Sequence, residues 1–178
     1  MGGSADRLVD CSYERHAGAI LGIFNEAIEN SVALYDYRPR PAESMVAWFE
    51  DKRRNGHPVI GVESPAGELL GFGTWGVFRV RPAYKYTVEH SVYVHHAHRG
   101  RGTGEVLLRA LIERAAAHEV HVLVGGIDAG NTGSIRLHQK LGFVHAGTVT
   151  QAGFKFGRWL DLAFYQLTLA TPLKPVDG

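Results

Sequence analysis

The sequence predicts a single α/β domain, and three observations point to this fold class. The chain has 178 residues, which is the size of one ordinary domain. Of these residues 45% are hydrophobic and 21% are charged, a globular composition that argues against a disordered or coiled-coil chain. The runs 88–94, 103–115 and 120–127 have the spacing of strand, helix and strand in turn, which is typical of a β-α-β unit. We therefore expect residues 1–178 to form one domain that folds alone.

Two amphipathic helices are predicted in the first third of the chain. Residues 16–29 repeat apolar side chains at helical spacing, with Ile20 and Phe24 on the same face. Residues 42–55 show the same repeat and end in a basic turn before Gly56, a natural stop for a helix. Each helix therefore has one apolar face to bury.

Strands are predicted where short apolar runs are separated by turn sequences. They lie at residues 58–63, 68–75, 88–94 and 120–127, with two more in the tail 143–170. The first two flank the turn 64–67 and are expected to pair as an antiparallel hairpin. In the third strand, Glu89 falls on the face opposite His90 because successive side chains alternate. A last helix is predicted from Asn131 to Leu141.

Charge and cysteine content exclude several functional classes. Lys and Arg number 19 against 18 Asp and Glu, and a net charge of +1 offers no broad attraction to nucleic acid or to an anionic membrane. The apolar stretches are far shorter than the roughly 20 residues of a membrane helix. The single cysteine, Cys11, cannot form an internal disulfide and is expected to be a small buried residue. We therefore expect a cytoplasmic protein with no nucleic acid or membrane partner.

A glycine-rich loop, His-Arg-Gly-Arg-Gly-Thr-Gly at 98–104, separates a strand from a long helix. Free N–H groups at such a helix start bind phosphate, and Arg99 and Arg101 add positive charge, so a pyrophosphate is the expected ligand. The common nucleotide motifs do not fit, because Glu105 interrupts the glycine spacing and no Gly-Lys-Ser/Thr follows. The alternative is a glycine-rich turn that only reverses the chain.

The loop residues carry a family resemblance. Residues 99–104, Arg-Gly-Arg-Gly-Thr-Gly, resemble the Arg/Gln-x-x-Gly-x-Gly/Ala signature of the GCN5-related N-acetyltransferase (GNAT) superfamily, and residues 131–143 resemble its second conserved block. The stretches 87–94, 134–143 and 155–162 are similar to the phosphinothricin and methionine sulfoximine N-acetyltransferase branch of that superfamily.

The resemblance, which runs from about residue 8 to 169, implies a fold. A GNAT domain has a mixed, mostly antiparallel sheet of about seven strands, flanked by about four helices. The sheet would be splayed at its centre between the strands at 88–94 and 120–127. The same extent implies an ordered core of about 8–169 with short flexible termini.

The resemblance also implies a reaction. Acetyl-CoA would donate an acetyl group to the amine of a small amino acid or analogue, such as methionine sulfoximine, methionine sulfone or phosphinothricin, by direct transfer in a ternary complex. Relatives are homodimers, and the apolar tail 143–170 is a candidate for that interface. Two alternatives stay open. One is acetylation of a protein N-terminus or lysine, and the other is a catalytically silent acyl-CoA-binding sensor, which would not need Glu89.

Two residues are candidates for the chemistry. An amine must lose a proton before it attacks a thioester, and Glu89 stands where the resembling branch has its presumed base, acting directly or through a water. The alternative for Glu89 is a solvated glutamate on a strand. His138 stands where the superfamily often has a tyrosine that protonates the leaving thiolate. It would either donate that proton or only contact the cofactor.

The remaining site residues follow from the resemblance and from the chemistry of the acceptor. The cofactor would be held by Val92, Tyr93, Val94, Arg99, Gly100, Arg101, Gly102, Thr103, Gly104, Asn131 and Ser134. An amino acid carboxylate calls for a guanidinium, and the loop 76–86 offers Arg79 or Arg81, with Phe78 and Tyr84 beside them. Tyr35 would line the acceptor pocket, or only pack at the end of a helix.

No metal site is expected. His95, His96 and His98 lie close together in sequence, but no partner ligand stands at helical i, i+4 spacing. The run His118-Glu119-Val120-His121 is one residue short of the zinc motif His-Glu-x-x-His.

Overall fold

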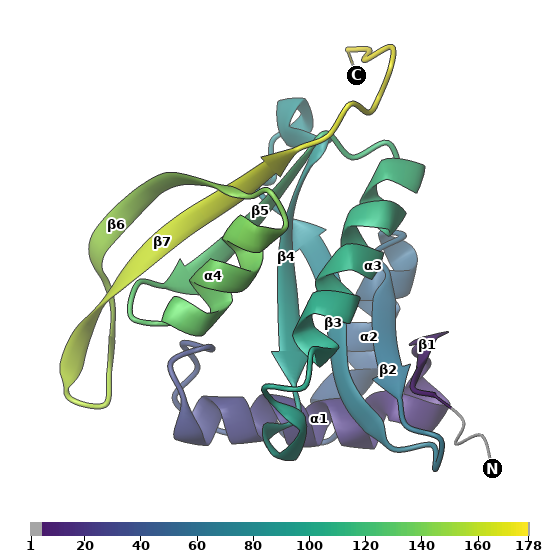
Figure 1. The fold of residues 1–178 in the computed structure, drawn as a ribbon, viewed down its shortest axis with the longest axis vertical. Coiled ribbons are helices and arrows are strands. Elements are labelled where there is room, and N and C mark those ends of the chain that lie inside the picture. Colours follow the sequence, from purple (N-terminus) through teal and green to yellow (C-terminus); the bar gives the residue numbers. More distant parts are fainter. Residues whose placement is uncertain (1–4, 178) are drawn as a thin grey trace. The chain divides into compact units, whose positions relative to one another are not determined.

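The computed structural model describes residues 5–177 (Figure 1). These residues form two compact units. The first unit contains residues up to Thr74 together with Val92–Leu111. The second contains Trp75–Ser91 and the residues from Ile112 onward. Residues 1–4 and 178, which belong to the predicted flexible termini, lie outside the described residues. Within the described chain, no helix has the length and apolar character needed to cross a membrane.

The described elements follow the predicted alternation of helices and strands. In chain order they are β1 (Arg7–Asp10), α1 (Tyr13–Asn30), α2 (Ser44–Arg54), β2 (Val59–Glu63), β3 (Leu69–Val77), η1 (Pro82–Tyr84), β4 (Thr87–Val94), η2 (His96–His98), α3 (Thr103–Ala117), β5 (Val122–Asp128), α4 (Thr132–Lys140), β6 (Val144–Lys155) and β7 (Arg158–Thr168). The strands form one sheet in the order β1-β2-β3-β4-β5-β7-β6. Strands β4 and β5 are parallel, whereas β1–β2, β2–β3, β5–β7 and β6–β7 are antiparallel. The predicted mixed, mostly antiparallel sheet of seven strands with four α-helices is therefore confirmed.

The start of the strand predicted at 120–127 was placed two residues too early. The apolar run was expected to enter its strand at residue 120, but β5 begins at Val122. The N–H group of Val120 still donates to the carbonyl of Ala115 at the end of α3, and Glu119 adopts a positive φ of 57° there. Local hydrogen bonding to the helix end thus outweighs the β propensity of the run.

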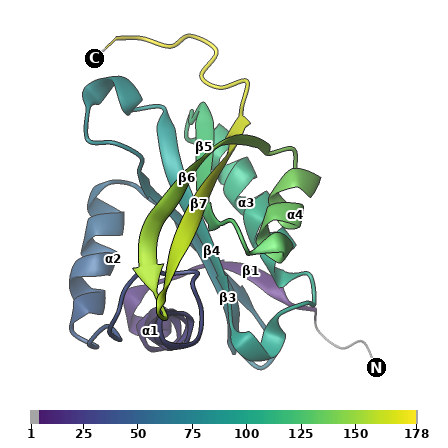
Figure 2. The ribbon, with the colours of Figure 1, turned by 90° about the vertical axis from the view of Figure 1, so that its left-hand side faces the viewer.

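The first unit buries apolar side chains on both faces of its strands. Helices α1 and α2 cover one face (Figure 2), where Phe24 meets Trp48 and Phe72 edge to face at centroid distances of 5.6 and 5.1 Å. On the other face, Leu107 of α3 packs with Val62 and Leu70. These contacts account for the apolar stripes of the helices, because each stripe faces the sheet.

The second unit is built around β5 and the long β6–β7 hairpin (Figure 1). Strand β5 pairs along its whole length with β7, from Val122–Thr168 to Asp128–Leu162. Strand β6 is mostly exposed, and its register with β7 shifts on both sides of Val149. The hairpin therefore has an inner strand that is part of the core and an outer strand that faces solvent.

Candidate active site

Glu89 lies on β4 with its side chain half-buried, and it alternates with the buried residues Val88 and His90. The predicted alternation along this strand is confirmed. The parallel register with β5 covers Thr87 to Glu89 and ends at the pair Glu89–Val124. The two strands thus pair over only part of their length, as the predicted splay requires.

The surroundings of Glu89 favour its neutral form. Burial raises the pKa of the Glu89 carboxyl group above its usual value, and the positive charge of Arg79 partly opposes this rise. No hydrogen-bond donor among the described residues reaches this carboxylate. A half-buried carboxyl group with a raised pKa and an adjacent cation is suited to accept a proton from an amine.

The loop before β4 gathers three of the predicted acceptor residues. The guanidinium of Arg79 lies over the Phe78 ring, 4.9 Å from its centroid, and Phe78 meets Tyr84 edge to face at 5.8 Å. Arg81 precedes the short helix η1 as its cap residue and is exposed. It has no ion pair or ring contact with another described residue. The structure therefore distinguishes the two arginines, which the sequence could not do. The positive charge of Arg79 affects the pKa of Glu89, and Arg81 is not among the causes of that shift.

His138 is buried on α4 and pairs with His90. The Nε2 atoms of the two rings lie 2.9 Å apart, and the rings stack with centroids 5.1 Å apart. The Nδ1–H group of His138 donates to the carbonyl oxygen of Ser134 over 2.8 Å, so in the neutral pair His90 donates to Nε2 of His138. Burial lowers the pKa of His90 to about 3 and also lowers the pKa of His138. Both rings are therefore neutral at pH 7, and both nitrogens of His138 are used within the protein.

Two adjacent glycines of β5 make room for these side chains. A methyl group at Gly125 would lie 3.0 Å from Cε1 of His90 and 3.2 Å from Nε2 of His138. A methyl group at Gly126 would lie 3.1 Å from Oε1 of Glu89. Successive strand residues face opposite sides, so one glycine accommodates the histidine pair and the other accommodates the carboxylate. The sequence analysis missed both, although two consecutive glycines in a buried strand are a usable signal of close approach.

Asn131 caps the helix that carries His138. Its side-chain oxygen accepts from the N–H group of Ser134 over 3.1 Å, which confirms the structural role of this residue as the N-cap of α4. The side chain of Asn131 is exposed and that of Ser134 is half-buried. Both therefore remain within reach of a ligand at this helix start.

The glycine loop has the backbone that its sequence demands. Gly100 and Gly102 have positive φ values of 76° and 88°, a region that side chains other than glycine rarely adopt. The carbonyl of Gly102 accepts from the N–H groups of Glu105 and Val106, so the N–H groups of Thr103 and Gly104 stand ahead of the first bonds of α3. These amides are the orphan donors of a helix start, which is where anions bind.

The two arginines of the loop differ in what they contact. The guanidinium of Arg99 forms an ion pair with Glu26 of α1 over 2.5 Å, and its Nε donates to the carbonyl of Val94 over 3.2 Å. Arg101 is exposed and has no ion pair with another described residue. Arg99 thus ties the loop to its own unit, and Arg101 is the cation available to a ligand. This distinction was not visible in the sequence.

The other cofactor residues of the first unit use their side chains for packing. Tyr93 belongs to the cluster under α1 and α2, with its ring 5.3 Å from that of Phe24, whereas Val92 and Val94 pack with Leu107 on the opposite face. The backbone contact of these three residues with the cofactor stays a prediction. Thr103 is buried at the first turn of α3.

Tyr35 lies in the segment between α1 and α2, and its side chain is half-buried. Asn25 of α1 holds this segment, because its side chain accepts from the N–H group of Arg40 over 2.8 Å and donates to the carbonyl of Arg40 over 3.0 Å. The guanidinium of Arg40 lies over the Phe24 ring at 4.2 Å. Tyr35 is therefore presented by an ordered segment of the first unit.

Comparison with known proteins identifies close relatives. The model of the acetyltransferase (GNAT) family matches residues 24–143. The chain is 47% identical over 150 residues to the L-methionine sulfoximine/L-methionine sulfone acetyltransferase of Pseudomonas aeruginosa, which covers 84% of this chain and 87% of that protein.

Two solved structures are similar over nearly the whole chain. A phosphinothricin acetyltransferase from Sinorhizobium meliloti, in complex with acetyl-CoA, superimposes with a TM-score of 0.92 at 33% identity, covering 98% of this chain and 95% of that one. A ribosomal-protein-alanine N-acetyltransferase from Brucella melitensis has a TM-score of 0.89 at 40% identity, covering 92% of this chain and 99% of that one.

Proposed function

This chain belongs to the GNAT acetyltransferase family, and on that premise we propose that it transfers an acetyl group from acetyl-CoA to the α-amino group of a small amino acid or analogue, of the methionine sulfoximine, methionine sulfone or phosphinothricin type. The single observation that carries the proposal is the half-buried Glu89 on β4, with Arg79 packed over Phe78 in the loop just before that strand. An α-amino acid carries a carboxylate and an amine on the same carbon. A guanidinium beside a base matches that pair of groups.

Glu89 is the general base. It accepts the proton that the acceptor's ammonium group must lose, directly or through a water, so that the nitrogen lone pair attacks the thioester carbonyl. The new C–N bond forms, the C–S bond breaks, and the thiolate leaves. Burial raises the pKa of Glu89, so this pKa is closer to that of the amine than the pKa of an exposed glutamate would be.

Arg79 binds the acceptor carboxylate. Its guanidinium is oriented by the ring of Phe78, which in turn contacts Tyr84. Arg81 lacks such support and is assigned no contact with the acceptor. Tyr35 is proposed as an acceptor contact on the family resemblance alone.

The diphosphate of acetyl-CoA binds the N–H groups of the glycine loop 99–104 at the start of α3, with Arg101 as the added cation. These residues fit the group because α3 begins here and the glycines at 100 and 102 keep side chains away from the N–H groups of its first turn. The backbone of 92–94 holds the acyl and pantetheine part, together with Asn131 and Ser134.

His138 supports the cofactor side of the site and does not protonate the leaving thiolate. Donation would require breaking its bond to Ser134 or to His90, and burial keeps the ring neutral. A thiol with an ordinary pKa near ~8.5 leaves as a thiolate that solvent can protonate. Of the two predicted roles, the geometry argues against proton donation, so cofactor contact is the role that we propose for His138.

The protein is a cytoplasmic homodimer in this proposal. The β6–β7 hairpin exposes Phe154, Phe156 and Trp159, and an apolar patch on an exposed hairpin fits an interface between two copies. The single thiol, Cys11, fits a reducing compartment. Analytical ultracentrifugation of the chain and of Trp159→Ser tests the dimer, which the variant should weaken.

The function is tested by following thiol release from acetyl-CoA with a panel of acceptors. Methionine sulfoximine, methionine sulfone and phosphinothricin should be acetylated, whereas peptides with an N-terminal alanine should not. The peptide result matters because of the similarity to the ribosomal-protein-alanine enzyme. Peptide acetylation without amino acid acetylation would overturn the proposed acceptor. Acetyl-CoA binding with no transfer to any acceptor would favour a sensor.

A further inference from the structure

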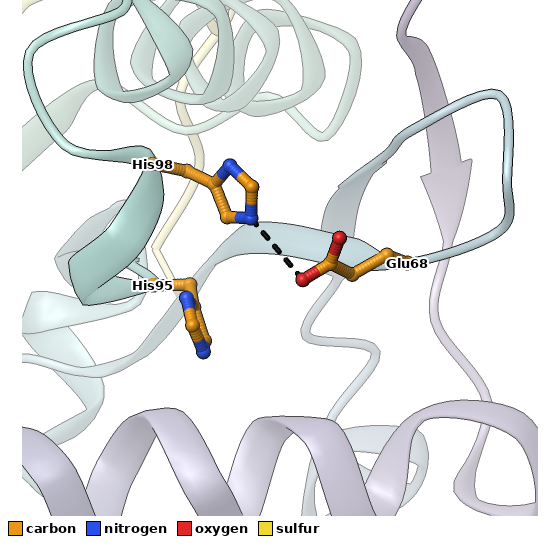
Figure 3. Close-up of side chains that lie close together, drawn as sticks. All are labelled: Glu68, His95 and His98. Carbon is orange, nitrogen blue, oxygen red and sulfur yellow. Dashed lines mark hydrogen bonds and ion pairs between the residues drawn. The ribbon is translucent and has the colours of Figure 1, made fainter.

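Three potential metal ligands come together at the end of the first hairpin. Glu68 precedes β3, while His95 and His98 flank and close the short helix η2 after β4 (Figure 3). One ligand atom from each of the three side chains lies within 4.8 Å of the other two. The Nε2 atom of His98 is already 3.1 Å from Oε1 of Glu68. The fold thus supplies the third ligand that the histidine run lacks in the sequence.

The ligand set has the chemistry of a transition-metal site. Two imidazoles and one carboxylate suit a divalent ion of the zinc class, which is commonly held by three protein ligands and a water. Two ligands of one zinc ion lie roughly 3.4 Å apart at tetrahedral geometry and Zn–N and Zn–O distances near ~2.1 Å. The His98–Glu68 distance of 3.1 Å is close to this separation, and side-chain rotation of partly exposed residues brings in the third ligand.

The backbone around these ligands is held by hydrogen bonds within the first unit. The N–H group of His95 donates to the carbonyl of Leu70 over 2.9 Å, and that of His98 donates to the carbonyl of His95 over 2.8 Å. The hairpin turn is closed by mutual bonds between Ser64 and Glu68. The three Cα positions are therefore restrained before any ion binds, which lowers the ordering cost of the site.

We infer that Glu68, His95 and His98 form a binding site for a divalent transition-metal ion of the zinc class. The ion would link the β2–β3 hairpin to the segment that enters the glycine loop, because His98 directly precedes Arg99. The site is separate from the chemistry assigned to Glu89, so neither proposal depends on the other. The competing interpretation is a simple ion pair between His98 and Glu68 on the surface.

The test is calorimetric titration of Zn²⁺ into the full chain, with the affinity tag removed and with metal first stripped by a chelator. Co²⁺ is titrated in parallel, because its absorption spectrum reports the ligand geometry. Cys11 does not compete for the ion, since burial raises the pKa of its thiol to about 12. The expected result is one ion bound per chain with micromolar affinity.

Variants decide which residues hold the ion. His98→Ala and Glu68→Gln should each weaken binding by about 10-fold or more. The matched controls are His96→Ala, a neighbour outside the ligand set, and His145→Ala, an exposed histidine of β6; both should bind as the parent does. Circular dichroism verifies that each variant is folded. Zn²⁺ should raise the Tm of the parent and not that of His98→Ala.

Two outcomes would overturn the inference. The first is the absence of saturable one-to-one binding in the stripped parent chain, which would leave only the ion pair. The second is an equal loss in His96→Ala and His98→Ala with none in Glu68→Gln, which would mean that the histidine run binds the ion without the hairpin.

Discussion

Two glutamates, one on β2 and one on β4, have opposite environments. Glu63, at the end of β2, is 1% exposed and binds Arg7 at 2.7 Å, Arg15 at 2.9 Å and His16 at 2.9 Å. The hydrogen bonds from His16 and Arg7 lower the pKa of Glu63 to about 2. Glu89 is half-buried without such donors, and burial raises its pKa.

The difference shows that donors, and not depth alone, decide what a carboxyl group does. Glu63 is the more buried of the two, yet it remains an anion because two guanidinium groups and an imidazole compensate its charge. Glu89 has only the partial help of Arg79, so its proton affinity is higher. The first glutamate stabilises the fold, and the second is suited to proton transfer.

The largest effect is expected from Glu89→Gln. Turnover should fall by about 10²–10⁴-fold because the amine loses its proton acceptor, while the affinity for acetyl-CoA stays close to that of the parent. Initial rates of thiol release and calorimetric titration of CoA measure the two quantities. Glu113→Gln, which changes an exposed glutamate of α3, is the matched control. If Glu89→Gln keeps parental turnover, Glu89 is not the base.

Removal of Arg79 should affect acceptor binding more than chemistry. In Arg79→Ala the KM for the amino acid should rise by about 10–100-fold, because a charge-assisted contact with the carboxylate is lost. Arg81→Ala should change the same KM by less than a factor of about 3, within the range of a surface residue. Steady-state kinetics with varied acceptor and saturating acetyl-CoA tests this. Equal effects of the two substitutions would remove the distinction between the arginines.

A smaller effect is expected from Gly126→Ala. The added methyl group would meet Oε1 of Glu89 at 3.1 Å and push the carboxylate away by a few tenths of an ångström. Turnover should fall by about 10-fold, since catalysis is sensitive to small displacements of the base. Gly18→Ala on α1, where a methyl group meets nothing within 4 Å, is the control and should keep full activity. Parental kinetics in Gly126→Ala would show that the carboxylate has more room than the structure indicates.

Glu63→Gln should lower the stability of the fold and leave the turnover per folded molecule unchanged, whereas Glu89→Gln should lower turnover. The Tm should fall by several degrees, because the buried acceptor of three donors loses its charge. The loss is moderated because the side chains of Arg7 and Arg15 are 63% and 61% exposed and stay solvated. Calorimetric melting of the variant, of Glu89→Gln and of the parent makes the comparison. A lower Tm only in Glu89→Gln would contradict these roles.

The smallest effect concerns the pH dependence of stability. The folded pKa of Glu63 is depressed to about 2, below the usual value of 4.5, so its stabilisation is present above about pH 4.5 and is lost as the pH falls toward 2. The Tm of the parent should therefore decrease over this window more steeply than that of Glu63→Gln. Melting curves between pH 7 and pH 2 measure the difference. Parallel curves would mean that Glu63 is not anionic down to such low pH.

Much of the fold was predictable from local patterns. The helical stripe containing Ile20 and Phe24 and the alternation around Glu89 lie where their spacing placed them, because burial of one face is recorded directly in the spacing of apolar residues. The strand start at Val122 was missed because Val120 is still hydrogen-bonded to the end of α3. The spacing of apolar residues carries no information on such a bond.

The candidate site was predictable only as a set of residue types. Its assignment as a GNAT site rested on the loop at 99–104 and on the block at 131–143, and the family match agrees with that assignment. Three contacts of the site join residues that are far apart in sequence. His138 pairs with His90, Gly126 leaves room for Glu89, and Arg99 forms an ion pair with Glu26. None of these contacts leaves a periodic or local signal.

By itself, the order of residues determined which segments become strands and helices and which loop presents bare amides, since these depend on neighbours along the chain. Only the tertiary structure decided which carboxyl group is held as an anion and which has its pKa raised, which arginine stays available, and that Glu68 meets two histidines. Those outcomes depend on desolvation and on charges brought within a few ångströms, and both arise only when the chain has folded.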